Sequence, residues 1–496
     1  MKRLIVIVFI IFGAFLTLCL YRTFAYDTSV VEEVPSTTDL EYTFKIGNSS
    51  IKQITVDSGE TRYYDIVLGN PNNAKISYSV YYEMVSPSTK PDGFSIEYTK
   101  KSTGESTGKV DKEGNITLNL VVTNTSSSAV TVKIGSVAGY VNGGELILGS
   151  GQTLIPEKIF PVIATKYVMG LNDRTTGDSG SGVYKVEHDA IAASNSATGS
   201  EIPASTDYRY YGKSPNNYIC LDMEGGSACP DRHLYRIIGS IFEDKDHTNR
   251  IKVIKATPLT DGTTKGFSWD YKVTNGSGSY SNIWATITSG NYSNSLTSGS
   301  QLMKLLNSGA WWNGTSGSYY NESTTATTVN FTNYKLSDKA KSYITTSRYY
   351  LGGYNNSKGV MTNQFYAYER GTTRYDTNRP LYWDGYVGLM YPSDFGYAAG
   401  NSCVTGTEPF SYDGGCYKKD WLWMTTSSDY TGAAEWLMSP ISGYFGDVFY
   451  VNSAGYVSYG NRSYSVNSAR PVFYLTSSAS ISDGEGTLNA PYILSE

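Results

Sequence analysis

Apolar and polar residues alternate with a period of two along much of the chain between about residue 40 and residue 159. In the clearest stretch, one face consists of apolar or aromatic side chains, namely Ile76, Tyr78, Val80, Tyr82 and Met84. Successive side chains of a strand point to opposite faces of a sheet, so this alternation predicts a strand with one buried face. Segments 64–68, 116–122 and 130–134 repeat the pattern.

Short segments rich in Asn, Gly or Ser separate these strands, at residues 70–73, 112–115 and 125–128. Such residues favour turns between strands. Strands of this length with turns at this spacing predict an antiparallel sandwich of immunoglobulin type over residues 37–165, here without an inter-sheet disulfide. No cluster of ionisable residues stands out in it, so we interpret it as a spacer or stalk.

Residues 166–206 are rich in Gly, Ser, Asp, Ala and Thr and contain few large apolar side chains. This composition predicts a linker with one short strand at 183–186. The linker contains Gly177-Asp178-Ser179-Gly180, which looks like the nucleophile motif of chymotrypsin-like proteases. Those enzymes need a histidine base placed earlier in the chain, and no histidine precedes Ser179, so we interpret Ser179 as a linker residue.

Residues 207–496 form one large region of alternating apolar segments, for which we predict an α+β domain. Two helices are expected, one at 300–307 capped by Ser300 and one at 338–345 capped by Ser337. Segments 385–398 and 435–440 are predicted to be strands within long loops. The charged turn at 243–247 contains a histidine but lacks the spacing of a calcium loop, so we interpret it as a solvated hairpin tip.

The stretch 454–475 is rich in Tyr, Ser and Asn and contains no acidic residue. Gly460-Asn461 accepts the dihedral angles of a tight turn, which predicts a hairpin with Val457 and Tyr459 before the turn and Tyr464 and Val466 after it. Tyr, Ser and Asn also make good recognition surface. The candidate ligand-binding residues are therefore Tyr444, Phe445, Tyr456, Tyr459, Asn461, Arg462, Tyr464 and Asn467. The alternative, that these tyrosines are cross-strand aromatics that stabilise the sheet, stays open.

The amino-acid composition argues against one class of partner, nucleic acid. Charged residues make up 17% of the chain and the net charge is -5, so there is no basic field for nucleic acid, and we expect no nucleic-acid partner. The chain contains 50 Gly and 44 Tyr, which suit many short strands with turn-rich connections. The chain is therefore expected to be mainly β.

The amino terminus has the features of an export signal. Lys2 and Arg3 precede an apolar run over residues 4–20 that is long for a signal peptide and at the lower limit for spanning a bilayer. We interpret residues 1–25 as a signal peptide cleaved after Ala25 or as an N-terminal membrane anchor. Either way the rest of the chain is expected outside the cell, secreted or anchored to the outer face of the cytoplasmic membrane.

Four cysteines follow that segment, namely Cys220, Cys229, Cys403 and Cys416. An even number of cysteines in an exported chain indicates two disulfides, and the short separations favour Cys220 with Cys229 and Cys403 with Cys416. Three connectivities are formally possible. The spacing of a zinc site is absent, so we predict no metal and no cofactor.

Several segments of the second region resemble, in order, an uncharacterised family of exported proteins from gut Firmicutes. They include "YRYYGKSPNNYICLD", "LYRIIGSIF", "QLMKLLN", "VGLMYPSDFGYA", "EWLMSPISG", "VFYVNSAGYVS" and "ARPVFYLTSSASISDGEGTLNAPYIL". The resemblance covers nearly all of residues 208–494. The segment "YVNGGELIL" is similar to the immunoglobulin-like sandwich that often precedes that domain.

The carboxyl-terminal part, with its Trp-Leu-x-Ser-Pro segment and Ala-Arg-Pro-Val strand, also resembles the C-type-lectin-like fold in its formylglycine-generating-enzyme variety. The resemblance implies that Trp436 packs centrally and that Arg470, followed by Pro471, is buried against carboxylates or carbonyls in a structural role. The reactive cysteine pair of the generating enzymes has no counterpart here. The sugar-binding motifs of calcium-dependent lectins are missing as well, so neither activity is implied.

These observations favour an extracellular binding protein, an adhesin or receptor-like protein, whose partner is a carbohydrate or protein ligand at a cell surface. The membrane would be a partner only through an uncleaved N-terminal segment. The alternatives are a secreted hydrolase of glycans or peptidoglycan and a structural coat protein. A hydrolase needs paired carboxylates or a nucleophile with a base. The candidate groups form no recognisable constellation in the sequence, and we predict no catalytic residue among Glu435, Asp447, Asp384, Asp420 and His233.

Overall fold

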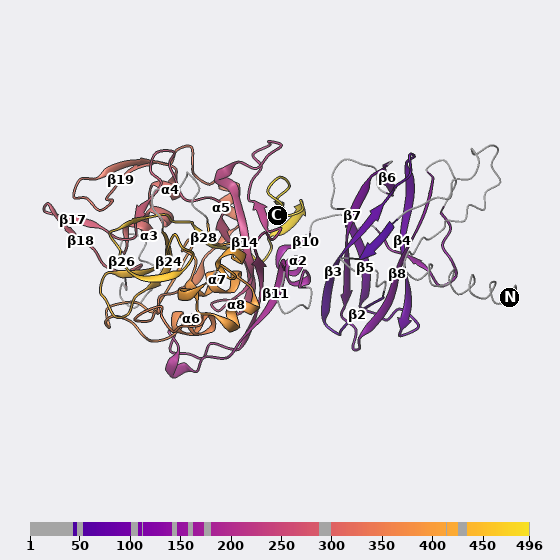
Figure 1. Ribbon diagram of the computed structural model, residues 1–496, viewed down its shortest axis with the longest axis horizontal. Coiled ribbons are helices and arrows are strands. Elements are labelled where there is room, and N and C mark those ends of the chain that lie inside the picture. Colours follow the sequence, from indigo (N-terminus) through magenta and orange to yellow (C-terminus); the bar gives the residue numbers. More distant parts are fainter. Residues whose placement is uncertain are drawn as a thin grey trace, which may run out of the picture. The chain divides into compact units, whose positions relative to one another are not determined.

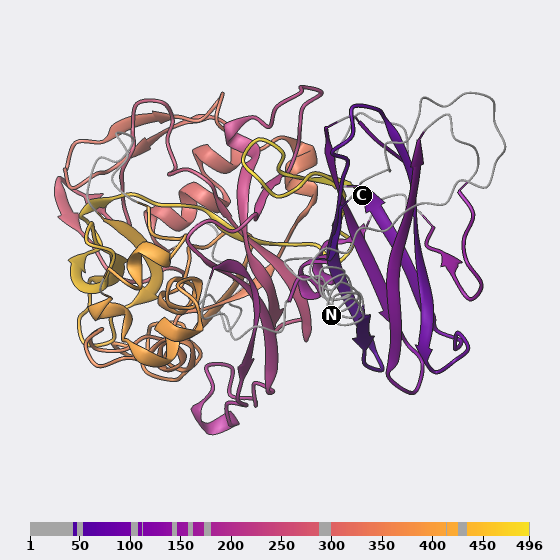
Figure 2. The same ribbon diagram turned by 45° about the vertical axis from the view of Figure 1, so that its right-hand side comes forward.

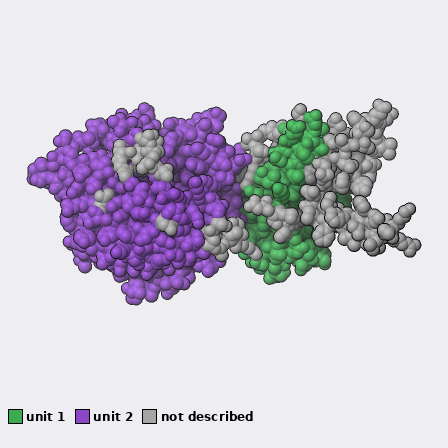
Figure 3. Space-filling model, in the orientation of Figure 1, with its two compact units in different colours: residues 1–160 green, residues 161–496 purple. Residues whose placement is uncertain are grey.

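The computed structural model of the chain describes residues 43–46, 53–100, 108–111, 113–140, 146–156, 162–172, 180–286, 299–412, 414–424 and 434–495. These residues are mainly β, as predicted. The predicted export segment lies outside them. Within the described ranges, no helix is long and apolar enough to cross a membrane. The chain divides into two units, Met1–Phe160 and Pro161–Glu496, which Figure 3 colours separately.

Unit 1 consists of two antiparallel sheets. The first has the strand order β1-β3-β7-β5, and the second has the order β2-β8-β4-β6 with β9 paired to β4 (Figure 1). The bounds of the first sheet are β1 (Thr43–Ile46), β3 (Glu60–Gly69), β7 (Asn115–Asn124) and β5 (Phe94–Lys100). Those of the second are β2 (Gln53–Val56), β8 (Val130–Tyr140), β4 (Ile76–Ser86), β6 (Lys109–Val110) and β9 (Thr153–Leu154).

The two sheets of unit 1 share one apolar core. Ile66 and Leu118 come from the first sheet, Val80 and Val132 come from the second, and all four are fully buried in the same cluster. The alternation predicted for residues 75–84 is confirmed on β4, where every second residue from Ile76 is buried before the pattern fades at its end. The strands pair in register over long stretches, as between Glu60–Gly69 of β3 and the whole of β7.

Unit 2 is built on a large mixed sheet. Its strand order is β10-β29-β30-β13-β14-β15-β28-β21, with β12 paired to β14 and β11 paired to β12. The only parallel pair within this sheet of described strands joins β13 to β30. The bounds are β10 (Val162–Ile163), β11 (Ser181–His188), β12 (Ser205–Gly212), β13 (Tyr218–Cys220), β14 (Leu234–Glu243), β15 (Thr248–Lys255), β21 (Ile344–Thr345), β28 (Val472–Leu475), β29 (Ser480–Asp483) and β30 (Tyr492–Ser495).

Smaller sheets and short helices fill the rest of unit 2. Figures 1 and 2 show α6, α7 and α8 grouped together beside the sheet β24-β25-β26. The helices are α2 (Ala164–Gly170), α3 (Gln301–Asn307), α4 (Ala310–Asn313), α5 (Asp338–Ser342), α6 (Thr362–Glu369), α7 (Pro392–Ala398) and α8 (Asn401–Gly406), with 3-10 turns at Ala193–Asn195, Asp231–His233, Pro409–Ser411 and Tyr417–Lys419. The remaining strands are β16 (Phe267–Ser268), β17 (Lys272–Thr274), β18 (Ser277–Ser279), β19 (Ser316–Tyr319), β20 (Thr327–Asn330), β22 (Ser347–Tyr350), β23 (Tyr382–Gly385), β24 (Glu435–Pro440), β25 (Asp447–Val451), β26 (Val457–Arg462) and β27 (Val466–Asn467).

The linker predicted over residues 166–206 is wrong where the structure describes it. Most of α2 lies at its start, and β11 pairs along its whole length with β12. Val183, Tyr184 and Val186 of β11 are buried, whereas Lys185 between them is exposed. The short strand predicted at 183–186 is confirmed within β11, but it belongs to the main sheet of unit 2 rather than to a linker. Unit 2 thus begins at Pro161 rather than after residue 206, and Ser179 lies outside the described residues.

The helix predictions are confirmed in part. Ser300 caps α3 as expected, because its side chain accepts a hydrogen bond from the Met303 amide at 3.1 Å. The second predicted helix is shorter than expected, since α5 ends at Ser342 and the next residues form β21. The expected strand at 385–398 is wrong over α7, where Pro392 occupies the first turn and the helix is buried all round, so no polar face marked it in the sequence.

A buried ion cluster links the main sheet to α7. Asp394 of α7 accepts from Arg209 Nη1 at 2.9 Å and also pairs with Lys252 of β15. Arg209 of β12 donates to Asp207 at 2.8 Å, and Asp207 pairs with His188 of β11 at the same distance. All five side chains are at least nine-tenths buried. We call this group, His188, Asp207, Arg209, Lys252 and Asp394, the ion cluster.

Mutual pairing keeps the ion cluster charged in the interior. Burial alone raises the pKa of Asp394, but Lys252 and Arg209 outweigh burial and hold that pKa below its ordinary value. The Tyr391 amide donates a further hydrogen bond to the Asp394 carboxylate at 3.0 Å, which fixes the start of α7. Removing one member of such a group leaves uncompensated buried charge, which costs far more than loss of a surface pair.

We expect the Asp394→Asn substitution to lower the free energy of unfolding of unit 2 by about 3–5 kcal/mol, because Arg209 and Lys252 lose their shared counter-ion. All eight tryptophans lie in unit 2, so urea unfolding followed by tryptophan fluorescence reports on it selectively. The control is Glu187→Gln, which breaks the exposed pair with Lys185 and should leave the transition unchanged. Equal behaviour of the two variants would contradict a stabilising role for the cluster.

Glu369 of α6 provides a pH test of the same interior. Burial raises the pKa of Glu369 to about 7, although Arg370 and the Ser393 hydrogen bonds oppose the shift. Because the pKa of Glu369 is raised in the folded state, protonation of this carboxyl stabilises the fold. The stabilisation is complete below pH 4.5, the ordinary pKa, and is lost as pH rises through about 7. We therefore expect the free energy of unfolding of the wild type to fall by about 3 kcal/mol across this pH window, relative to that of Glu369→Gln. Urea unfolding of both proteins at a series of pH values measures this difference. If the free energies of unfolding of the wild type and Glu369→Gln changed in parallel with pH, the raised pKa would be contradicted.

Candidate functional site

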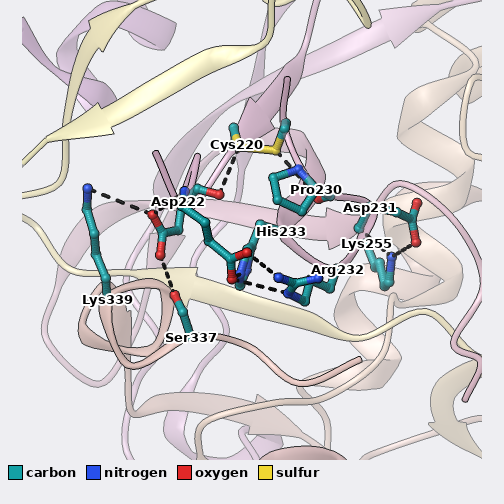
Figure 4. Close-up of a disulfide and its surroundings, with 11 residues drawn as sticks. Cys220, Asp222, Pro230, Asp231, Arg232, His233, Lys255, Ser337 and Lys339 are labelled. Atoms are coloured by element: carbon teal, nitrogen blue, oxygen red, sulfur yellow. Dashed lines mark hydrogen bonds and ion pairs between the residues drawn. A yellow bond between two sulfur atoms is a disulfide. The ribbon is translucent and has the colours of Figure 1, made fainter. Parts of the chain in front are cut away.

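Both disulfides pair the cysteines that the sequence separations favour, Cys220 with Cys229 and Cys403 with Cys416. The first closes a short loop after β13, which Figure 4 shows together with the residues around it. Asp222 and Glu224 of this loop and the buried His233 place ligand-type atoms within 4.8 Å of one another. The sequence analysis missed this group because His233 is separated from the two acids by the disulfide loop.

The two carboxylates of this group are already engaged by the protein, whereas His233 Nδ1 has no hydrogen-bond partner among the described residues. Ser337 Oγ donates to Asp222 at 2.6 Å, with Lys339 at 4.0 Å from the same carboxylate (Figure 4). Glu224 pairs with Arg232 and lies 2.8 Å from His233 Nε2. Burial lowers the pKa of His233, and Glu224 opposes that shift. Two cations and a serine hydroxyl thus take the place that a metal would need, and the group orders the disulfide loop.

The candidate ligand residues lie on and around the sheet β24-β25-β26. The predicted hairpin is wrong in register, because Gly460 and Asn461 lie inside β26 and Asn461 pairs with Val448 of β25. The turn falls earlier, at residues 452–456, where Gly455 adopts a φ of 82°. A bulge between β25 and β26 takes up the extra residues, so the sequence signal of Gly460-Asn461 marked an irregular strand rather than a turn.

Exposure separates the predicted ligand residues into groups. Tyr444 and Phe445 are exposed by 55% and 46%, and Arg462 and Tyr459 are exposed as well. Asn467 was predicted to be on the ligand surface, which is wrong: its side chain is buried, because β27 pairs with β16 inside the unit. The side chain of Asn461 lies outside what the structure describes.

The aromatic side chains among these residues do not form one surface. Tyr456 packs against Tyr417, with ring centroids 6.4 Å apart. Tyr459 has Phe410 as its neighbour, also at 6.4 Å. Tyr464 lies in a third place, edge-on to Tyr280 at 4.6 Å. Only Tyr464 and Phe445 share a neighbour, since Tyr280 also lies 5.2 Å from Phe445.

Around Tyr280 the structure gathers an aromatic cluster from four separate segments. Phe445 lies just before β25 and Tyr464 just after β26, at the same end of that strand pair. Tyr271 and Tyr280 flank the β17–β18 hairpin, which lies at the same end of unit 2 in Figure 1. Tyr375, from the loop after α6, lies 6.4 Å from Phe445 and is exposed by 45%. The name aromatic cluster denotes Tyr271, Tyr280, Tyr375, Phe445 and Tyr464 below.

Polar contacts hold the backbone under the aromatic cluster. Asn282 Nδ2 donates to the carbonyls of Ile441, Tyr444 and Asp447, each at 2.9 Å. The Asn282 amide and Arg379 Nη2 both donate to the Phe445 carbonyl, at 3.0 and 2.9 Å. The loop that carries Tyr444 and Phe445 is therefore fixed in its exposed conformation.

Close packing also explains a glycine in this loop. A Cβ atom at Gly446 would lie 2.5 Å from the ring of Tyr280, so only glycine lets that ring approach the backbone. Arg462 lies at the edge of the cluster, with its guanidinium 6.0 Å from the ring of Tyr464. The sequence analysis found Phe445, Arg462 and Tyr464 but missed Tyr271, Tyr280 and Tyr375, which lie far away in the sequence.

Among the groups considered for catalysis, Glu435 and Asp420 lie near the same buried arginine, Arg470, whereas Asp384 is bound to another arginine. Asp384 forms a bidentate pair with Arg348 at 2.9 and 3.0 Å. Glu435 is buried and paired with Arg470 at 2.6 Å, and Arg470 also donates to the Leu422 carbonyl at 2.7 Å. Asp420 is buried without a salt bridge among the described residues, and burial raises its pKa well above the ordinary value.

The residues to which the fold resemblance gave structural roles are all in the interior. Trp436 is fully buried and its Nε1 donates to the Phe267 carbonyl at 2.7 Å. Arg470 is buried against a carboxylate and a carbonyl, and the Pro471 carbonyl accepts from the Lys255 amide at 3.0 Å. These contacts tie the segment before β28 to the main sheet.

Comparisons with protein-family models, with curated proteins and with solved structures return no match for this chain. The resemblance to an exported family therefore stays a prediction, and function has to be argued from the geometry alone.

The group at the disulfide loop gives a test of metal independence. We expect Ca²⁺, Zn²⁺ and EDTA to leave the thermal midpoint of the purified protein unchanged, because Arg232, Ser337 and Lys339 already satisfy the two carboxylates. Differential scanning fluorimetry of the wild type, with Glu224→Gln measured in parallel, checks this. A rise in the midpoint with one of the ions that Glu224→Gln abolishes would show a metal site instead.

Proposed function

We propose that this protein is an extracellular binding protein, an adhesin or receptor-like protein, whose second unit binds a carbohydrate or protein ligand at a cell surface. The observation that carries the proposal is the aromatic cluster with its neighbour Tyr444. Tyr375, Tyr444 and Phe445 are among the most exposed large apolar side chains of the described residues. Water-exposed aromatic rings gathered from several segments mark an interaction site rather than a core.

The chemistry of the cluster suits recognition. Tyrosine offers a rigid ring and a hydroxyl group, with little side-chain entropy to lose on binding. The flat rings can stack on sugar faces or on apolar groups of a protein, and the exposed Arg462 beside them can pair with a carboxylate. The hydrogen bonds from Asn282 and Arg379 hold the loop in place before a ligand arrives, which lowers the cost of binding.

The fold is compatible with a binding module, unit 2, that is presented on a spacer, unit 1. Two antiparallel sheets on one core make unit 1 compatible with an immunoglobulin-like sandwich. In unit 2, β10 near the start pairs with β29 near the end, and long loops with small sheets depart from the central strands. This arrangement is compatible with the C-type-lectin-like fold inferred from the sequence.

An extracellular location is consistent with the chemistry of the second unit. Its two disulfides persist in an oxidising environment and are rare in the cytosol. We infer that the chain is secreted or anchored to the outer face of the membrane by its N-terminal segment. Binding is better supported than hydrolysis, because Glu435 and Asp384 are each neutralised by an arginine instead of facing one another across a cleft.

The test is a glycan array and a panel of cell surfaces probed with labelled purified protein. We expect the double substitution Tyr444→Ala and Phe445→Ala to weaken binding at least about tenfold, because the exposed anchors are lost while the loop backbone keeps its Asn282 contacts. The matched control is Tyr459→Ala, which removes an exposed ring on β26 outside the cluster and should leave affinity unchanged.

Equal binding by both variants would contradict the assignment of the ligand surface. No binding by folded wild type, together with ordered self-association in light scattering, would favour the structural coat protein.

A further inference from the structure

Unit 2 contains a cavity whose lining includes no residue of the aromatic cluster. It has a volume of about 700 Å³. This size falls within the usual range of small-ligand sites. Its lining includes Lys213, Tyr218, Arg236, Lys418, Asp420 and Trp423. We call it the Arg236 cleft.

Arg236 of β14 lies between two aromatic rings. Its guanidinium is 4.6 Å from the ring centroid of Tyr218 and 4.3 Å from that of Trp421. Tyr218 is the cross-strand partner of Arg236 in the β13–β14 register, which accounts for the first contact. Trp421 is held by a hydrogen bond from its Nε1 to the Tyr210 carbonyl at 3.0 Å. The rings fix the plane of the guanidinium.

The charge of Arg236 has no counter-ion among the described residues. Its Nε donates to Asn217 Oδ1 at 2.8 Å, and its two terminal nitrogens make only long contacts, 3.4 Å each, to the Trp421 and Pro215 carbonyls. Burial lowers its pKa to about 10, and it stays charged at neutral pH. Buried arginines such as Arg209 and Arg470 instead bind a carboxylate directly.

The surroundings of Arg236 add positive potential and little negative charge. Lys213 and Lys418 are exposed residues of the cleft lining. Asp420 is the only acidic residue of that lining among the described residues, and burial raises its pKa well above the ordinary value, which favours the neutral carboxyl. One oxygen of Asp420 accepts from the Leu422 amide at 2.8 Å, and the other has no partner.

The remaining surface of the cleft is aromatic or hydroxyl-bearing. Tyr218 and Trp423 are half-buried and both reach the lining, and Trp423 is held edge-on by Tyr417 at 4.7 Å. Ser214 and Thr487 add hydroxyl groups. Aromatic faces with scattered hydroxyl groups suit a ligand that has both apolar faces and many hydroxyls.

We propose that the Arg236 cleft binds an acidic saccharide, a sugar chain that carries carboxylate groups. The two terminal nitrogens of Arg236, which make only long contacts within the protein, can donate two parallel hydrogen bonds to a carboxylate, the geometry for which arginine is suited. Lys213 and Lys418 attract further carboxylates along the chain, and Trp423 offers its ring to a sugar face. A free phosphate or the carboxyl end of a peptide shares part of this chemistry but does not use the aromatic and hydroxyl surface. The proposal does not depend on the aromatic cluster.

The test is isothermal titration calorimetry of the purified protein with trigalacturonate and with its methyl ester, which keeps the sugars and removes the charge. We expect trigalacturonate to bind and its methyl ester to bind at least about tenfold more weakly. Arg236→Lys keeps the charge but loses the planar fork, and should weaken trigalacturonate binding by about tenfold or more. Circular dichroism establishes that this variant is folded.

A second variant tests the same site without disturbing the contacts that Arg236 makes within the fold. Lys213→Ser with Lys418→Ser changes only exposed residues, and should weaken binding several-fold. Its control is Lys45→Ser with Lys90→Ser, two exposed lysines of unit 1, which changes the net charge equally and should have no effect.

Three outcomes would overturn the proposal. Equal affinity for the ester and the acid would show that the carboxylates are not recognised. Equal competition by inorganic phosphate would reveal a non-specific anion site. Tighter binding of an acetylated peptide with a free carboxyl end than of trigalacturonate would assign the cleft to peptides. The Tyr444→Ala and Phe445→Ala double variant should bind trigalacturonate as the wild type does, even if it no longer binds the array. The two sites are therefore tested separately.

Discussion

The interior of unit 2 depends on a charge constraint rather than on apolar packing alone. Asp394 must satisfy two buried cations at once, Arg209 and Lys252, and Arg209 must in turn satisfy Asp207. These groups come from β12, β15 and α7, which are far apart in the sequence. A misplaced element would leave a charge unpaired in a medium of low polarity, at a cost of several kcal/mol. We therefore regard the ion cluster as the feature that fixes how α7 sits on the main sheet.

Both proposed sites use residues that the fold has immobilised beforehand. Asn282 and Arg379 hold the backbone under Phe445, and two rings and Asn217 hold the guanidinium of Arg236. The two sites differ in what is left unsatisfied. The aromatic cluster leaves apolar area in water, whereas the Arg236 cleft leaves a cation without a counter-ion. The two deficits suit different classes of ligand, so the two proposed sites can be tested independently.

The sequence predicted local features well and non-local ones poorly. The strands of unit 1 could be predicted because each has one buried face, and α3 could be predicted from its capping serine. The strand predicted at 183–186 is confirmed within β11, but its membership of the main sheet was missed because its pairing with β12 is a tertiary fact. The helix α7 was missed because a helix buried on all sides has no polar stripe. Two of the five residues of the aromatic cluster, Phe445 and Tyr464, could be found from the sequence. The other three could not, since they become neighbours of these two only through the fold.

The parallel pairing of β30 with β13 has a consequence for the order of events in the cell. Residues Tyr492–Ser495 enter the sheet next to Tyr218–Cys220, so the sheet stays incomplete until nearly three hundred further residues have left the ribosome. Contacts of such long sequence separation form late, because their loop-closure entropy must be met first. The main sheet of the second unit therefore gains its β13–β30 pair late in folding, after most of that unit has been synthesised.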